Sequence, residues 1–370
     1  MRSFFSCIVM VLFAFLSCVD NGNSVNPPPK SESSRKIAVI TTVNDFTSPM
    51  NFQIIDVGSA DYTVSANNLI TGPLHTDLAV RTYGKDIYIL ERYGKDNIIK
   101  YDSKEMAVDY SEPLGLGASI NIQDIAVVSQ TKAYISCLNS KDLIVFNPNT
   151  GKRISAIDLS DYSAGEAPHP YAGALAVYGP YVYVACQRFT TDFYGVQDYG
   201  QIVIIDSRTD EVEKVITLER KNPQSMDIFH NRLLVASAGE MDSETFAYVG
   251  GGVEMIDLTA NQNIGVIADI DGASRVAFVS LTKAYVSAGG FSDFEVFPIN
   301  PTAKTTGESL GYIGDGMGGI VYDGFKVYVG DMSFTSPGVV VINPATNAFE
   351  ERIPVASPMM PAGLGVIFGD

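Results

Sequence analysis

Residues 181–185, Tyr181-Val-Tyr-Val-Ala185, form a short segment of aromatic, β-branched and small apolar side chains. This composition, with its period of two, predicts a β-strand rather than a helix. Similar segments recur about 43 to 51 residues apart, which is the period expected of propeller blades. The copies are residues 36–40, 86–90, 132–136, 181–185, 232–236, 283–287 and 326–330.

Each copy is followed by a loop and by a second apolar segment that usually closes on Asp or Asn, as in Ile202-Val-Ile-Ile-Asp206. Turn-forming residues come next, as in Asn147-Pro-Asn-Thr-Gly151, and predict a tight hairpin to an outermost strand such as residues 153–157. A segment rich in small residues, such as 174–178, precedes each copy and suits an inner strand near a crowded axis. The repeat therefore contains four strands.

The two ends of the chain complete the pattern. The first copy, residues 36–40, has no inner strand before it, whereas residues 362–368 form an inner-strand segment with nothing after it. We therefore predict an all-β, seven-bladed β-propeller with four-stranded blades, its ring closed by the C-terminal strand joining the N-terminal blade. Closure removes open sheet edges. A two-sheet sandwich is the alternative, but it needs no fixed period and does not explain the unmatched C-terminal strand.

The N-terminal residues are typical of an export signal. Arg2 precedes the apolar run 8–15, which is too short to span a membrane, and Ser17-Cys18 resembles the end of a bacterial lipobox. The sequence thus predicts a lipoprotein signal peptide at 1–17 with lipidation at Cys18, cleavage without lipid being the alternative. A flexible tether follows at 18–35, and the propeller occupies 36–370. We expect an exported protein, anchored by lipid alone to a bacterial membrane, at the outer membrane or cell surface.

The Tyr-Val-Ala or Tyr-Val-Ser strand, the Val-Ile-Asp strand and the Thr-Asn or Thr-Gly hairpin together resemble the YVTN or YncE-like propellers, over residues 36–370. The chain has no Trp, which separates it from tryptophan-docked and Trp-Asp repeat propellers. As an exported lipoprotein with such a ring, it is also similar to the surface corrinoid-binding propellers of gut bacteria. That resemblance implies a corrinoid or another small molecule as ligand, and an outer-membrane or other envelope protein as partner.

The amino-acid composition limits which partners and which catalytic or metal sites the chain can have. A net charge of −17 repels phosphate backbones and argues against nucleic acid. The chain has only three His, and neither a nucleophile elbow nor a phosphate loop is present. We therefore assign no catalytic residue, no metal ligand and no cofactor, leaving open a structural Ca²⁺ near Asp242-Ser-Glu244. Cys137 and Cys186 occupy equivalent positions in adjacent repeats, on the order of 10 Å apart, so both should be free and buried.

Three long loops are predicted to lie on one face of the fourth and fifth blades, at residues 161–171, 186–199 and 237–249. Long loops on a rigid scaffold commonly bind ligands. Aromatic rings next to carboxylates and an arginine suit a planar or sugar-like ligand, a cation or a protein surface. Alternatively, the aromatic residues pack the loops against each other. The candidate ligand-binding residues are Tyr171, Arg188, Asp192, Tyr194, Asp198, Glu240 and Asp242.

These observations favour a monomeric, non-enzymatic binding lipoprotein of the cell surface or periplasm, with its ligand or partner on the loop face of blades four and five. Two alternatives stay open. One is a metal-dependent hydrolase or lactonase-type propeller enzyme, which needs a polar constellation at the mouth of the central channel. The other is an adhesive or structural surface protein, which would use the outer rim.

Overall fold

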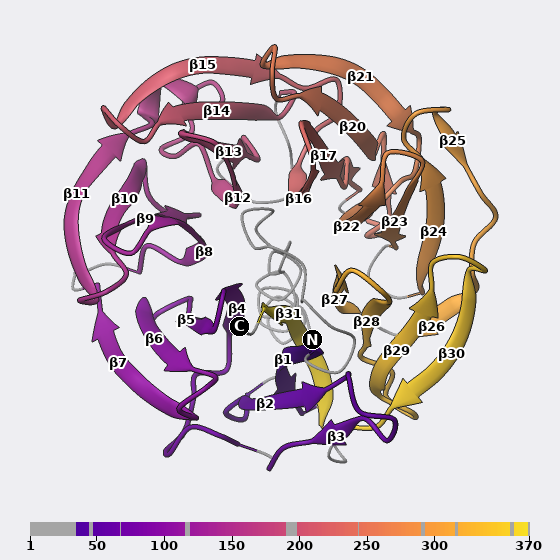
Figure 1. The fold of residues 1–370 in the computed structure, drawn as a ribbon. Helices are drawn as coiled ribbons and strands as arrows, with labels where there is room; N and C mark the ends of the chain where they lie inside the picture. The colour runs from indigo at the N-terminus through magenta and orange to yellow at the C-terminus, as the bar shows by residue number, and fades with distance from the viewer. Residues whose placement is uncertain are drawn as a thin grey trace.

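The strands form a ring of radial sheets around a central axis (Figure 1). The computed structural model describes residues 35–43, 47–66, 68–114, 119–189, 198–242, 244–289, 293–314, 317–355 and 359–368. The ring has seven four-stranded blades, as the sequence predicted, and in each blade neighbouring strands are antiparallel. We number the blades from the one that holds the N-terminal strand.

The strands fall into four positions, counted outward from the axis. The inner strands of blades one to seven are β31 (Met360–Phe368), β4 (Leu78–Tyr83), β8 (Ile122–Ser129), β12 (Ala172–Tyr178), β16 (Pro223–Phe229), β22 (Ala273–Ser280) and β27 (Met317–Tyr322). The second strands are β1 (Arg35–Thr42), β5 (Asp86–Glu91), β9 (Lys132–Cys137), β13 (Tyr181–Cys186), β17 (Arg232–Ser237), β23 (Lys283–Ala288) and β28 (Val327–Asp331).

The third strands are β2 (Asn51–Asp56), β6 (Asn97–Asp102), β10 (Asp142–Asn147), β14 (Gln201–Asp206), β20 (Gly252–Asp257), β24 (Phe294–Asn300) and β29 (Gly338–Asn343). The outer strands are β3 (Thr63–Val64), β7 (Ala107–Pro113), β11 (Lys152–Asp158), β15 (Glu211–Thr217), β21 (Gln262–Ala268), β25 (Thr305–Thr306) and β30 (Ala348–Ile353). The predicted order of inner, Tyr-Val, Asp-ending and outermost strands is therefore confirmed.

Blade one joins the two ends of the chain. Strand β1 pairs antiparallel with β31, with Ile37 opposite Val366 and Val39 opposite Leu364. The N-terminal and C-terminal strands lie side by side in the ring (Figure 1). This confirms that the C-terminal segment supplies the inner strand of the N-terminal blade, so that the inner edge of β1 is paired.

The core lies between the blades. Side chains alternate along β13, so Val182 and Val184 enter the cluster between blades three and four, whereas Tyr183 and Ala185 enter the cluster between blades four and five. All four side chains are fully buried. Because both faces of each sheet are covered by a neighbouring blade, the second strands are apolar on both sides.

The two cysteines illustrate this alternation. Cys137 belongs to the cluster between blades two and three, and Cys186 to the cluster between blades three and four. Both are free and buried, as predicted, and blade three itself separates them. Burial raises the pKa of the Cys186 thiol to about 12, which makes this thiol unreactive at neutral pH.

Side chains of the inner strands satisfy backbone groups of the next blade. Asp124 Oδ2 accepts the Leu175 N–H at 2.7 Å, and Ser225 Oγ accepts the Val276 N–H at 3.0 Å. Asp227 Oδ2 accepts the Phe278 N–H at 2.6 Å. An inner strand has no neighbour on its axial side, so these groups would otherwise be buried without a partner.

Two features depart from the regular repeat. A two-stranded hairpin, β18 (Glu240–Met241) with β19 (Tyr248–Val249), projects between the second and third strands of blade five. In blade six a further strand, β26 (Tyr312–Gly314), pairs with β24 beyond β25. The part of the chain that the structure describes contains no helix long and apolar enough to cross a membrane.

Candidate functional site

Antiparallel blades place two kinds of connection at the same end of the ring. The loops from the second to the third strand and the connections into the next inner strand share one end, which we call the loop face. The tight turns lie at the opposite end, the turn face. All the described candidate residues belong to loop-face segments. Of the remaining candidates, Asp192, Tyr194 and the lipidation residue Cys18 lie outside the described residues.

Arg188 connects two of the long loops. Its guanidinium lies 3.2 Å from Asp198 Oδ2 and donates to the carbonyl oxygens of Tyr199 at 3.3 Å and Ser163 at 3.5 Å. The Arg188 side chain is mostly buried, whereas that of Asp198 is half exposed. Arg188 therefore holds the loop after β13 against the connection that leads into β12.

Tyr171 is a buried residue within the same pair of loops, and its carbonyl oxygen accepts the Gln187 N–H at 3.1 Å. It is 3% exposed and has a φ of +55°. Its ring packs edge-to-face on Phe189 at 5.5 Å and on His169 at 5.9 Å. Burial lowers the pKa of His169, so the imidazole is neutral at pH 7. The three aromatic rings pack against one another within these loops, in which Asp198 and Tyr199 are exposed.

Glu240 and Asp242 stabilise the blade-five hairpin. Glu240 pairs with Lys221 at 2.7 Å. Asp242 Oδ1 accepts the backbone N–H groups of Thr245 at 2.7 Å and Glu244 at 2.9 Å, and the hydrogen bonds from Thr245 hold the pKa of Asp242 below its ordinary value. These bonds form an Asx turn at the tip of the hairpin. The structure thus brings Tyr171, Arg188 and Asp198 together, and places Glu240 and Asp242 on a separate hairpin.

Tyr248 belongs to the second strand of the hairpin. Burial raises the pKa of its hydroxyl to about 12, and the positive charge of Arg275, at the start of the next inner strand, partly offsets that rise. The outward side of the same strand carries Val249, which is 63% exposed.

Exposed apolar side chains recur around the loop face. Large apolar residues are at least 49% exposed on four second-to-third-strand loops, in blades two, four, five and seven: Tyr93, Tyr199, Val249 and Phe334. Exposed aromatic residues on separate loops of a rigid scaffold are typical of a recognition surface. Tyr199 and Val249 lie in long loops predicted from the sequence, but neither was among the candidate ligand-binding residues. The sequence reasoning missed Tyr93 and Phe334, whose only signal was an aromatic residue in a short loop at the same repeat position.

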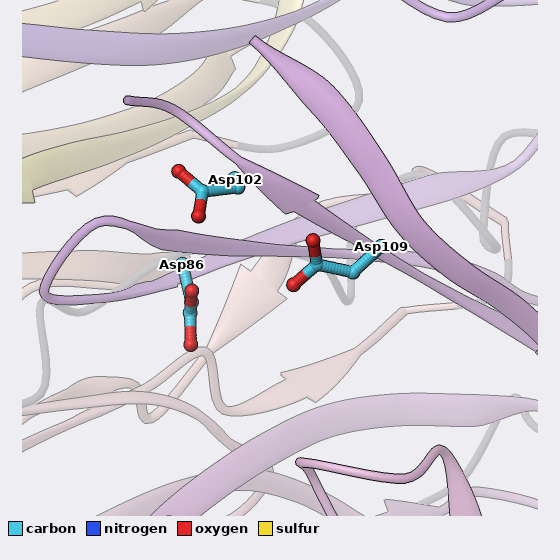
Figure 2. A group of neighbouring side chains, drawn as sticks. All are labelled: Asp86, Asp102 and Asp109. Carbon is cyan, nitrogen blue, oxygen red and sulfur yellow. The ribbon is translucent and has the colours of Figure 1, made fainter. Parts of the chain in front are cut away.

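Three carboxylates gather on the turn face of blade two. Asp86, Asp102 and Asp109 come from β5, β6 and β7 and lie close to one another (Figure 2). Lys100 Nζ lies 3.0 Å from both Asp86 Oδ2 and Asp109 Oδ2, and Lys85 pairs with Asp102.

Burial alone would lower the pKa of Lys100, but its hydrogen bonds to Asp86 and Asp109 outweigh burial and keep the pKa above its ordinary value. The two lysine ammonium groups therefore already balance two of the three carboxylate charges in this cluster. Its geometry supports a structural ion-pair network between three strands of one blade.

The comparisons with known proteins support the fold and indicate no particular function. No family model matches the chain, and no curated protein matches it. Among solved structures, dihydro-heme d1 dehydrogenase NirN in complex with DHE is similar with a TM-score of 0.57 and 14% identity, covering 94% of this chain and 79% of that chain. BamB from Moraxella catarrhalis has a TM-score of 0.48 and 16% identity, covering 90% and 86%. The protein is a seven-bladed β-propeller.

Proposed function

We propose that the protein is a non-enzymatic binding propeller of the bacterial cell envelope that captures its ligand or partner on the loop face. The observation that carries the proposal is the set of exposed residues Tyr93, Tyr199, Val249 and Phe334, which project from loops of four different blades. The ring beneath them is stiff because each blade buries both of its faces. Recognition on such a surface needs little ordering of the scaffold, which favours binding.

The long loops of blades four and five supply the polar part of this surface. Asp198 is held by Arg188 and stays half exposed beside Tyr199. A flat ligand with hydrogen-bonding edges, such as a corrinoid, or an envelope protein with a mixed apolar and basic surface, fits this combination of rings and carboxylates. The predicted signal peptide and lipid anchor would place the loop face outside the cytoplasm.

A thermal-shift screen of the full chain tests this proposal. The panel contains a corrinoid, a haem and a set of sugars, because any ligand that binds only the folded state raises the melting temperature by mass action. We expect one ligand class to raise the midpoint, and Tyr199→Ala combined with Phe334→Ala to abolish the shift. The matched control is Leu281→Ala combined with Phe349→Ala, which removes two exposed apolar residues outside the loop face and should keep the shift.

A protein partner is tested in parallel with the same variants. Cross-linking on intact cells, followed by mass spectrometry, should then give loop-face cross-links that the Tyr199 and Phe334 variants lose and the control variants keep. An equal effect of both pairs of substitutions on ligand shift and cross-linking would contradict a binding site on the loop face.

A further inference from the structure

A cavity of about 430 Å³ opens between blades five and six. Its walls come from the connection between β21 and β22, the end of β23, the strand β24, and residues 306–309, which begin at the last residue of β25. The outer edge of blade six is interrupted here, because β25 and β26 pair with opposite ends of β24 and the chain between them leaves the sheet. The volume is within the range of about 300 to 1,000 Å³ found for small-molecule sites.

The floor of the cavity is apolar. Ile270 and Ala288 are buried, and Phe297 is partly exposed and packs against the core cluster between blades five and six. Glu295 is two residues before Phe297 on β24, so both side chains project from the same face of the strand. An aromatic ring and a carboxylate thus line one wall together.

The rim of the cavity is strongly acidic. Its carboxylates are Asp269, Asp271, Asp293, Glu295 and Glu308. Arg220 pairs with Asp269, and the Gly251 N–H donates to Asp271 at 3.0 Å. Among the described residues, neither Glu295 nor Glu308 has an ion-pair partner. Lys304, near in sequence, directs its Nζ to the Ile264 carbonyl oxygen at 3.3 Å.

The spacing of the carboxylates discriminates between a metal ion and an organic cation. Chelation of one ion requires ligand atoms that converge on a point. Within the described part of the chain, the one group of three or more possible metal ligands within 4.8 Å of one another is Asp86, Asp102 and Asp109, on another blade. The carboxylates of the cavity are therefore spread along its rim, above an apolar floor.

We propose that this cavity binds an aliphatic polyamine, a small molecule whose ammonium groups are separated by methylene segments. Glu295 and Glu308 would each hold an ammonium group, and the ring of Phe297 would contact the methylene chain and the adjacent positive charge. The cavity lies at the loop-face end of blades five and six, but its lining includes none of Tyr93, Tyr199, Val249 and Phe334, and the inference does not depend on the function proposed above.

Isothermal titration of the full chain with spermidine tests the inference. The titration is done at 0.15 M salt, where distant surface charges are screened over about 8 Å. We expect saturable binding of one spermidine per chain. Glu295→Gln combined with Glu308→Gln should weaken it by about tenfold or more, as expected from losing two charge-assisted contacts.

The matched control is Glu211→Gln combined with Glu213→Gln, two exposed residues on the outer strand of blade four. This control removes the same charge from a chain of net charge −17, so it reports general attraction of cations. We expect it to change the affinity by less than about twofold. The single substitution Glu308→Gln, at an exposed position, gives a second test that does not depend on packing in β24.

Two comparison ligands complete the experiment. 1,8-Octanediol has a similar length without charge and should not bind, and Mg²⁺ at the concentration of spermidine should not displace it. Absence of saturable spermidine binding, equal weakening by the cavity and control variants, or displacement by Mg²⁺ would each overturn the proposal.

Discussion

Asp227 lies on the inner strand β16, and its position there shifts the pKa of its carboxyl. Burial raises the pKa of its carboxyl to about 7, and the N–H groups of Phe278 and Ile228, together with the charge of Arg81, limit that rise. The carboxyl is needed as an acceptor for the Phe278 N–H of the next blade, and it occupies a site where a negative charge is poorly solvated.

The raised pKa of Asp227 predicts a pH dependence of folding stability. The folded protein holds this proton more tightly than the unfolded chain, so the contribution is fully present below about pH 4 and is lost as the pH rises to about 7. At about 1.4 kcal/mol for each pKa unit, the loss attributable to this residue is on the order of a few kcal/mol. Asp227→Asn keeps an acceptor and should flatten the dependence of unfolding free energy on pH, measured by urea unfolding between pH 4 and pH 8.

The exposed control Asp61→Asn should leave the slope of this dependence unchanged. A slope equal to that of the wild type in Asp227→Asn would show that another group is responsible.

At the scale of the element, hydrogen bonds between the Tyr-Val strands and the Asx hairpins link adjacent blades. The Tyr183 hydroxyl donates to Asn261 Oδ1 at 2.6 Å, and Tyr285 donates to Asn347 Oδ1 at 2.6 Å. Both asparagines have a positive φ in the turn before an outer strand. Each buried tyrosine therefore extends from its own second strand to the hairpin of the next blade, so the repeat motif encodes the contact between repeats.

A double-mutant cycle tests this link. Tyr183→Phe removes the hydroxyl and should cost about 1 kcal/mol of unfolding free energy, because the Asn261 oxygen loses its donor. Asn261→Gly keeps the positive φ and removes the acceptor. The double variant should be less destabilised than the sum of the two single variants by about 0.5 to 1.5 kcal/mol, measured by denaturant unfolding. Additive losses would mean that the hydrogen bond contributes no coupling between the blades.

At the scale of the whole molecule, stability depends on closure of the ring. Leu364, Val366 and Ile367 of β31 are at most 2% exposed, and they pack against blades on both sides. Burial of three such side chains contributes roughly 5 to 9 kcal/mol, which is comparable to the whole stability of a domain.

Deletion of residues 359–370 should therefore abolish the cooperative thermal transition and produce oligomers in size-exclusion chromatography, since the inner edge of β1 is then open. Adding the deleted segment as a peptide should restore the transition. Deletion of residues 369–370 alone is the control, because β31 remains complete. A monomeric truncated protein that melts at the wild-type temperature would show that the other six blades hold the ring without closure.

The sequence by itself determined the architecture, because the strand period, the turn chemistry and the blade repeat are local signals. Residues 36–40 and 362–368 were enough to predict the shared blade. The first repeat lacks an inner strand and the C-terminal segment is an inner strand without a repeat, so pairing the two completes the seventh blade. The free state of Cys137 and Cys186 followed from the same repeat. The tertiary structure decided what the candidate residues do: Tyr171 is buried against other aromatic rings, and Arg188 holds two loops together.

The sequence also could not show which exposed residues of different blades lie on the same surface. Tyr93 and Phe334 are far apart in the chain, and they belong to one surface because the ring brings their loops to the same end. Glu295 and Glu308 flank a cavity because the outer edge of blade six is interrupted between them. A period identifies which residues form strands, but only the closed ring places side chains of different blades next to each other.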